Sequence, residues 1–510
     1  MRFLAVYTLL LIGSSVFAQQ VNERNLFQYN EIKKAYWKNS QQHTSFKESY
    51  SDSIAGYQII FKDEAKPQFK MRPLVDFSIT NQSSPDLFKG LGLGSEFRFQ
   101  HKKWNAGVSY LINRQQFVDY QNQFVKENKV VPGMDISKGL SSNYIRNNYL
   151  SGFVNFKANQ FFTLEAGFGR NFIGDGYRSL LLSDVSGSSP YLKIQTKFWN
   201  IQYTNLFTSH RNIFQVEGRN ELYKKKYTAT HYLDWRATKW LSVGLFETII
   251  WGAEEGNYTR GFDVNYANPF IFYRPVEFSI GSSDNVLVGA NLKLTIAKNQ
   301  VFYSQLLFDE FLLDELRADL TQLRNPNDSI RSGWWANKYG IQFGWTSFDL
   351  FKIKGLQTRV EFNLVRPYTY AHSNPTQAYS HNNLSLAHPL GANFYEYLVR
   401  LNYEVNRWNF AVNYHQNRQG KSTFGTNYGE NLQLTNVSRE LDYENELTQG
   451  QQVNVQYLEG TVGYLLHKRT STTVAITYIN REETGSPQSL ASNLFMIRLH
   501  SNLFNKYFDF

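Results

Sequence analysis

The feature that most constrains the fold of this chain is a period of two in its side chains, which recurs from about residue 72 onward. Residues 356–364 read LQTRVEFNL and residues 397–405 read YLVRLNYEV, so apolar and polar side chains largely take turns. Successive side chains of a β-strand point to opposite faces, so each such segment has one apolar and one polar face. The pattern predicts strands, each with one face in an apolar environment.

About eighteen segments of this kind follow one another, and several are nine to twelve residues long, enough to cross a bilayer at a tilt. They start near residues 72, 94, 103, 149, 161, 190, 199, 226, 239, 286, 300, 335, 355, 394, 407, 452, 470 and 493.

The links between these segments alternate between short and long. The short links lie at 101–102, 158–160, 198–199, 238–239, 298–299, 406–407 and 467–468, with a middling one near 347–354. The long links are 114–148, 170–189, 208–225, 252–285, 310–334, 367–393, 417–451 and 481–492. Outer-membrane barrels have short periplasmic turns and long extracellular loops, whereas a soluble β-sandwich has no reason to alternate in this way. The sequence therefore predicts an all-β transmembrane outer-membrane β-barrel of about 18 antiparallel strands.

Composition agrees with a barrel. Aromatic residues make up 16% of the chain, yet the mean hydropathy is −0.46, as expected when only alternate residues face lipid. Four short links place a bulky aromatic residue beside or near a basic one (Lys103-Trp104, Phe198-Trp199, Lys239-Trp240 and Arg407-Trp408), which suits the predicted periplasmic interface of the membrane. The chain has no cysteine, which excludes disulfides, cysteine-based zinc sites and lipid attachment at cysteine. The formal net charge of +10 comes without any nucleic-acid motif.

The two ends of the chain add an export signal and a membrane orientation. Residues 1–18 read as a secretory signal peptide, with Arg2 before a short apolar run and Ala18 at the cleavage point. Residues 19–71 are expected to form an N-terminal periplasmic segment, helical over part of 22–38, and residues 72–510 the barrel. The final residue, Phe510, resembles the terminal aromatic by which outer-membrane barrels are recognised, and is expected to close the last strand. An even strand count then puts both termini on the periplasmic side and the long loops outside the cell outer membrane.

Three of the long loops carry features of their own. Leucines recur at three- to four-residue spacing in 310–324, which predicts an amphipathic helix in an extracellular loop. That helix either plugs the lumen as a lid or packs on its own loop. Loops 266–279 and 365–394 are rich in aromatic residues and proline, which fits either sugar binding or the packing of loops on one another. No nucleophile motif and no regular histidine spacing is present, so neither catalysis nor a metal or other cofactor is expected.

Several loop motifs resemble the Wzi family of capsule-assembly outer-membrane proteins. They are Asp175 to Asp184 (DGYRSLLLSD) with Pro190-Tyr191, Asn268-Pro269-Phe270 with Tyr273 to Phe278 (YRPVEF), Phe308 to Phe311 (FDEF) and Ala387 to Phe394 (AHPLGANF). The latter three are most similar to the branch from gliding bacteria that includes the gliding motility protein RemB. The resemblance implies an eighteen-stranded barrel that holds capsular polysaccharide at the cell surface or takes part in gliding.

The expected function is that of a non-enzymatic surface protein that binds or retains polysaccharide, for capsule assembly or for gliding and adhesion. The alternative is a porin or substrate-specific channel; an outer-membrane hydrolase is a weaker third reading. Expected partners are outer-membrane lipid and lipopolysaccharide, extracellular or capsular polysaccharide, the barrel-assembly machinery and the gliding machinery, but no nucleic acid. The residues expected to contact sugar are Tyr177, Arg178, Tyr273, Arg274, Glu277, Arg366, Tyr368 and His388.

Overall fold

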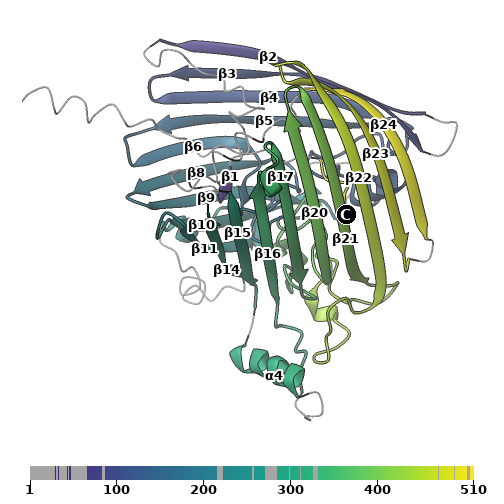
Figure 1. Cartoon of the computed structure of the whole chain (residues 1–510). Helices are drawn as coiled ribbons and strands as arrows, with labels where there is room; N and C mark the ends of the chain where they lie inside the picture. The colour runs from purple at the N-terminus through teal and green to yellow at the C-terminus, as the bar shows by residue number, and fades with distance from the viewer. Residues whose placement is uncertain are drawn as a thin grey trace, which may run out of the picture.

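The computed structural model describes residues 29, 33, 43, 45–47, 66–82, 87–214, 222–255, 258–269, 284–297, 299–310, 312–325, 331–468, 470–486, 489–501 and 506–510. The predicted signal peptide lies outside these residues. Eighteen antiparallel strands form a closed barrel, in which the first strand, β2, pairs with the last, β24 (Figure 1). The prediction of an all-β barrel with eighteen strands is confirmed.

Along the chain, the barrel strands are β2 (Gln68–Gln82), β3 (Leu87–His101), β4 (Trp104–Gln115), β5 (Ile145–Lys157), β6 (Phe162–Gly169), β8 (Ser189–Phe198), β9 (Ile201–Asn212), β10 (Lys224–Trp235), β11 (Leu241–Gly252), β14 (Asn285–Ile296), β15 (Gln300–Phe308), β16 (Tyr339–Phe348), β17 (Leu356–Val365), β20 (Phe394–Val405), β21 (Trp408–Lys421), β22 (Gln451–His467), β23 (Thr472–Thr484) and β24 (Leu490–His500). Seventeen of the eighteen start within four residues of their predicted positions, and β3 starts seven residues before its own.

The two ends of the barrel differ in the length of their links. At one end, which we call the short-turn end, the links run from two residues (102–103) to seven (349–355). At the other end, the loop end, most links are long, for example 116–144, 253–284 and 366–393. The predicted long stretch 481–492 is wrong, because β23 continues to Thr484 and β24 begins at Leu490. Arg481 and Glu483 lie within β23, where their side chains are at most 15% exposed.

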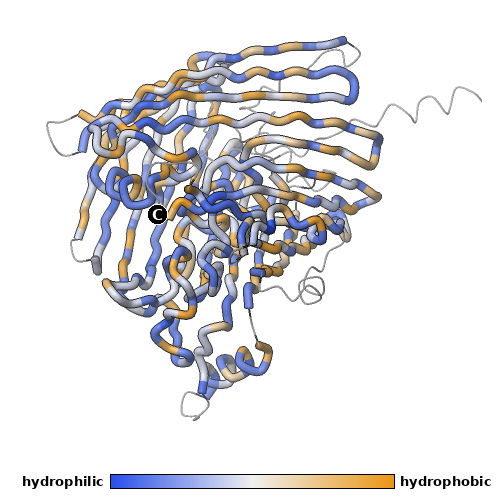
Figure 2. The backbone as a smooth tube through the Cα atoms, turned by 180° about the vertical axis from the view of Figure 1, so that it is seen from behind, coloured by the Kyte–Doolittle hydropathy of each residue, from blue (hydrophilic) through white to orange (hydrophobic). Residues whose placement is uncertain are grey.

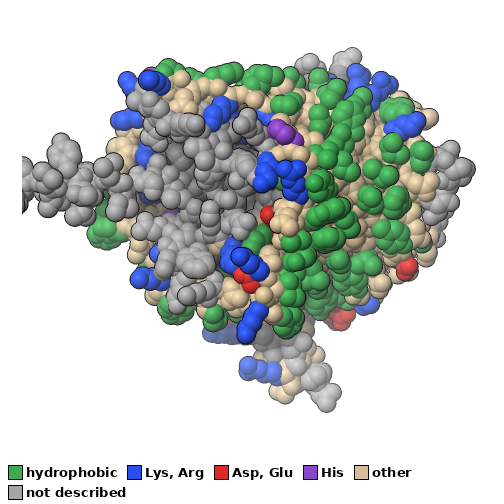
Figure 3. Space-filling model, turned by 45° about the horizontal axis from the view of Figure 1, so that its top comes forward, with side chains coloured by type: hydrophobic (Ala, Val, Ile, Leu, Met, Phe, Trp, Pro, Cys, Tyr) green, Lys and Arg blue, Asp and Glu red, His purple; other side chains and the backbone are tan. Residues whose placement is uncertain are grey.

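The side chains are arranged inside out relative to a soluble protein. In β20, the apolar Tyr397, Val399 and Leu401 are 36–51% exposed on the outer face, whereas Glu396 is fully buried on the inner face. The same alternation of orange and blue runs along the strands in Figure 2, and apolar side chains cover the wall visible in Figure 3. An outer apolar band with a polar interior is the pattern of a membrane barrel. Among the described residues, no helix has the length and apolar character that a membrane crossing requires.

Described residues that precede the first barrel strand contact the barrel and its lumen. At the short-turn end, Lys33 pairs with Asp349. The short strand β1 (Phe46–Lys47) pairs with β7 (Phe172–Ile173), and Phe46 belongs to the apolar cluster within the lumen. Of the segment predicted to precede the barrel on the periplasmic side, the described residues Phe46 and Lys47 therefore lie within the barrel.

The end of the chain departs from the prediction as well. The last strand stops at His500, so the prediction that Phe510 closes it is wrong. Residues 506–510 instead lie inside the lumen, where Phe510 reaches Arg481 near the loop end (C in Figure 1).

Candidate functional site

Two long loops fold into the lumen and fill it. Leu180, Leu181 and Leu182 of loop 170–188 pack against Tyr370 and Tyr379 of loop 366–393 and against inward-facing apolar residues of the wall. The hydroxyl of Tyr370 donates to the Leu180 carbonyl at 2.8 Å, and that of Tyr379 donates to the Leu181 carbonyl at 2.7 Å. The apolar run LLL, unusual in a loop between polar strand ends, is thus the core that holds the two loops together.

Beside this core lies a buried charged network centred on Arg178. Its guanidinium nitrogens lie 3.0 Å from a carboxylate oxygen of Glu396 and 3.4 Å from one of Asp509. Glu361 accepts hydrogen bonds from the backbone N–H groups of Tyr177 and Arg178 at 2.9 and 3.1 Å. Burial alone would lower the pKa of Arg178, but the two carboxylates raise it above its ordinary value. Arg178 is therefore permanently charged and joins loop 170–188 to both β20 and the segment after β24.

His388 connects the same network to the next loop. Its Nδ1 accepts the N–H of Leu390 at 3.2 Å, and its Nε2 lies 2.7 Å from Glu396 Oε2, so the proton is on Nε2 and is donated to Glu396. Gly391, with a positive φ of 71°, closes this turn by donating to the His388 carbonyl. Burial lowers the pKa of His388, although Glu396 acts in the opposite direction. His388 thereby holds the turn 388–391 against the wall.

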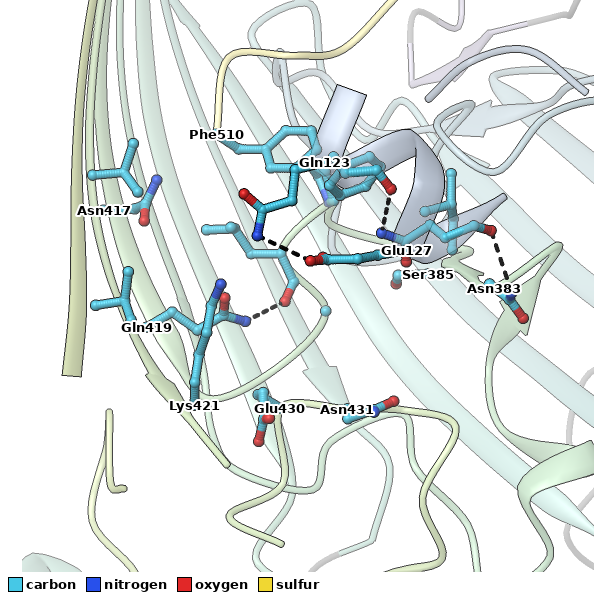
Figure 4. A pocket seen from close by; sticks show the side chains of 18 of the residues that line it. Gln123, Glu127, Asn383, Ser385, Asn417, Gln419, Lys421, Glu430, Asn431 and Phe510 are labelled. Atoms are coloured by element: carbon cyan, nitrogen blue, oxygen red, sulfur yellow. Dashed lines mark hydrogen bonds between the residues drawn. The ribbon is translucent and has the colours of Figure 1, made fainter. Parts of the chain in front are cut away.

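Above this network, at the loop end, lies a cavity of about 430 Å³ (Figure 4). Its volume is within the usual range for small-molecule sites, about 300–1,000 Å³. The lining combines aromatic rings with amides and charged groups, chiefly Tyr120, Gln123, Phe124, Glu127, Asn383, Asn417, Gln419, Lys421, Glu430, Asn431, Gln433, Arg481, Glu483, Phe508 and Phe510. We call it the loop-end cavity.

One side of the loop-end cavity is the helix α2 (Asp119–Asn128), which lies in the loop between β4 and β5. The side chain of Gln82, the last residue of β2, accepts the N–H of Asp119 at 3.2 Å and donates to its carboxylate at 2.9 Å. One of the backbone N–H groups that the first turn of a helix leaves unpaired is thereby hydrogen-bonded. Phe117 and Val125 belong to an apolar cluster with inward-facing wall residues. The opposite face of α2 leaves Gln123 and Glu127 exposed, 3.0 Å apart, at the cavity.

The facing side of the cavity is the barrel wall. Asn417, Gln419 and Lys421, at alternate positions near the end of β21, point into it (Figure 4). Asn417 is 2% exposed, and its Nδ2 makes no hydrogen bond within the described part of the chain. Arg481 on β23 pairs with Glu483 at 2.8 Å, but its Nε and Nη1 likewise lack hydrogen-bond partners among the described residues. Buried donors of this kind would gain stability from an acceptor supplied by a ligand.

The aromatic rings, amides and carboxylates of the loop-end cavity are groups that can bind a sugar. Aromatic rings pack on apolar surfaces such as the C–H face of a sugar ring. Amides and carboxylates supply directional donors and acceptors for hydroxyl groups. Among the described residues, no group of three potential metal-ligating side chains lies close enough to hold an ion.

The residues predicted to contact sugar are only partly brought together. Tyr177, Arg178 and His388 meet in the buried network beneath the cavity. Arg366 and Tyr368 lie elsewhere: Arg366 pairs with Asp319 at 3.4 Å, and the Tyr368 hydroxyl donates to the Asn427 carbonyl at 2.8 Å. All five are buried or nearly so, and their contact with sugar stays a prediction. Tyr273, Arg274 and Glu277 lie outside the described residues.

The helix predicted at 310–324 is present as α4 (Leu313–Arg324), but it does not plug the lumen. It stands apart from the wall beyond the ends of β15 and β16 (Figure 1). Asp319 accepts the N–H of Gly333 at 2.7 Å, and Glu315 accepts from the Tyr443 hydroxyl at 3.1 Å. The lid or plug prediction is wrong. The structure has a surface helix, as in the alternative, but its contacts are with other loops as well as with its own.

The sequence reasoning missed the lining of the loop-end cavity. A weak signal was present, because amides at alternate positions near the loop end of β21 (Asn417 and Gln419) are unusual for a strand that faces only lipid and solvent. The contribution of Phe508 and Phe510 could not be seen, because they were assigned to a strand.

Comparison with known proteins supports the fold. No family model matches the sequence, and no curated protein sequence does either. Among solved structures, Wzi of Escherichia coli, described as a carbohydrate-binding β-barrel involved in group 1 capsule assembly, is similar with a TM-score of 0.52 and 10% identity, over 86% of this chain and 85% of that one. OprD and OpdK of Pseudomonas aeruginosa give TM-scores of 0.43 and 0.44 at 9% identity, over 86% and 85% of this chain and 97% and 98% of theirs. The chain therefore has the fold of an outer-membrane barrel.

Proposed function

We propose that this chain is a non-catalytic outer-membrane β-barrel that binds surface polysaccharide at its loop-end cavity. In this proposal the loop end faces the cell exterior and the short-turn end faces the periplasm, so the cavity meets polymer outside the cell. The observation that carries the proposal is the lining of the cavity, in which aromatic rings, the unpaired amide donor of Asn417 and the unpaired guanidinium donors of Arg481 surround a space of small-molecule size. The Wzi structure, which shares the fold, is described as carbohydrate-binding, which is consistent with this use of a barrel.

The filled lumen weighs against the alternative of a diffusion channel. Loops 170–188 and 366–393, β1 and the segment after β24 all pack within the barrel and bury apolar and charged side chains against one another. An eighteen-stranded barrel would otherwise enclose an aqueous channel. The capsule-retention and gliding roles both follow from holding polymer at the cell surface, and the similarity of loop motifs to the Wzi family and its RemB branch supports considering both.

The direct test is binding of purified capsular or extracellular polysaccharide to the detergent-solubilised protein, measured by isothermal titration calorimetry. We expect binding by the parent and a loss of about tenfold or more for Asn417→Ala combined with Gln123→Ala, which removes one group from each side of the cavity. Asn325→Ala, an exposed amide next to α4, is the matched control and should bind as the parent does. If the double variant binds as well as the parent does, the loop-end cavity is not the binding site.

A second experiment separates the biological roles and the channel alternative. A deletion strain scored for capsule staining and for surface spreading shows which process depends on the protein. Single-channel recording in planar bilayers should give low conductance for the parent. Large, steady conductance together with no polysaccharide binding would favour a channel.

A further inference from the structure

The segment after β24, Lys506–Phe510, which we call the C-terminal segment, is built into the lumen by specific contacts. Directly after β24, Ser501 donates its N–H to the Val75 carbonyl at 2.8 Å. The ammonium group of Lys506 then lies 2.9 Å from the carboxylate of Asp76 on the inner face of β2. Two residues from the first strand thus fix the direction in which the segment enters.

Its fourth residue, Asp509, is the anchor. The carboxylate accepts a hydrogen bond from the Tyr177 hydroxyl at 2.6 Å and lies 3.4 Å from Arg178 Nη1. Arg178 Nη2 also donates to the Asp509 carbonyl at 3.1 Å, and His415 lies 3.6 Å from the carboxylate. Asp509 is 2% exposed. An ion pair buried this completely, with its remaining positions hydrogen-bonded, holds the segment in one register.

The anchor directs the two neighbouring phenylalanines into the loop-end cavity. Phe508 and Phe510 both line the cavity and are only partly buried, unlike Asp509 between them. The ring of Phe510 packs edge-on against Phe124 of α2 with centroids 5.2 Å apart, and Phe508 packs near Phe117 at 5.7 Å. Figure 4 shows Phe510 across the cavity from Asn417 and Gln419. The segment therefore places two rings opposite a wall of amides.

The charges around the cavity restrict the ligand. Three carboxylates line it, Glu127, Glu430 and Glu483, against two cationic side chains, Lys421 and Arg481. One of the two cations is already paired, because Arg481 lies 2.8 Å from Glu483. A polymer of uronic acids would bring further negative charge to this lining, whereas neutral sugar rings would not.

We propose that the C-terminal segment is part of the ligand site, with Phe508 and Phe510 as the aromatic platform on which a neutral sugar residue of the polysaccharide stacks. The inference rests on the proposed function, which does not specify the aromatic residues or the class of sugar. Stacking covers the C–H face of the ring, and the opposite amides bond its hydroxyl edge.

The first test compares Phe508→Ala combined with Phe510→Ala against the parent on a panel of neutral and uronate-containing oligosaccharides. The parent should bind neutral members and reject the uronates, and the double variant should bind the neutral ones about tenfold or more weakly. Phe424→Ala, at a fully exposed loop position, is the control and should bind normally. The conservative pair Phe508→Tyr and Phe510→Tyr should keep most of the affinity. Equal binding by the alanine variant, or tighter binding of uronates by the parent, overturns the proposal.

A second test does not depend on the stability of that variant. Because the chain has no cysteine, Phe510→Cys introduces a single reactive thiol. A small maleimide added outside intact cells should label it slowly, and a neutral oligosaccharide from the panel should protect it. Phe424→Cys should be labelled fast whether or not sugar is present. Labelling of Phe510→Cys that sugar does not slow contradicts the placement of the platform.

The two proposals fail in different ways. If the parent binds no polysaccharide or oligosaccharide, the proposed function is wrong. If the parent binds but the alanine variant binds equally, only the role of the C-terminal segment is wrong.

Discussion

At the scale of single residues, Arg178 is a buried cation shared by two buried carboxylates. It lies between Glu396 and Asp509, both buried, so its removal would leave two carboxylates without a counter-charge. We expect Arg178→Met to reduce the free energy of unfolding by about 3–5 kcal/mol, measured by thermal unfolding in detergent. Arg178→Lys keeps the charge but not the planar donor fork, so its free energy of unfolding should lie between those of the parent and Arg178→Met. A melting temperature equal to that of the parent would show that the network adds nothing to stability.

His381, in the short strand β18 (Ser380–His381), predicts a pH dependence. Burial, with a contribution from Arg211, lowers its pKa to about 3, whereas the unfolded chain has about 6.5. As the pH falls from 7 to 5, the unfolded chain takes up a proton that the folded chain does not, so stability is lost on acidification, by about 2 kcal/mol for this group. Its Nδ1 accepts the N–H of Arg211 at 3.0 Å, an acceptor that asparagine can imitate.

The measurement is the melting temperature of parent and His381→Asn in detergent at both pH values. The variant should lose less stability between pH 7 and 5 than the parent does. The exposed His467→Asn is the control and should follow the parent. An identical slope for His381→Asn would mean that other groups set the acid sensitivity.

At the scale of elements, the strands followed from the sequence and the lumen did not. Alternation and link length are local signals, so all strands except β3 were placed to within four residues of their observed starts. The last three residues, Phe508-Asp509-Phe510, also alternate and so resemble the end of a strand. What takes them into the lumen is the pairing of Asp509 with Arg178, 331 residues away along the chain. No local pattern contains that information, and the same holds for the packing of Leu180 against Tyr370.

For helix α4 the element was predicted correctly but its location was not. Its leucine spacing correctly predicted a helix, but spacing does not say which surface an apolar face covers. Since α4 lies outside the barrel and contacts loop residues such as Gly333 and Tyr443, replacing 313–324 with a short glycine-serine linker should leave single-channel conductance and melting temperature nearly unchanged. The corresponding replacement of 171–187, which removes the Leu180–Leu182 core and Arg178, should raise conductance. If the replacement of α4 raised the conductance, α4 would be the plug that the sequence suggested.

At the scale of the whole molecule, the inside-out arrangement of side chains sets where a charge is tolerated. Val399 is on the outer face of β20 and partly exposed, whereas its neighbour Leu398 is fully buried on the inner face. If the outer face meets hydrocarbon, Val399→Arg should cost about 2–4 kcal/mol of folding free energy in a bilayer, since the guanidinium cannot reach water on that face. The measurement is urea unfolding of protein refolded into lipid vesicles. Val399→Leu, which keeps the surface apolar, should cost little. In a soluble barrel an arginine on the outer face would be hydrated and would not lower stability. Equal stability of Val399→Arg and Val399→Leu would therefore contradict the assignment of the barrel to a membrane. The position of the loop-end cavity outside the cell depends on that assignment.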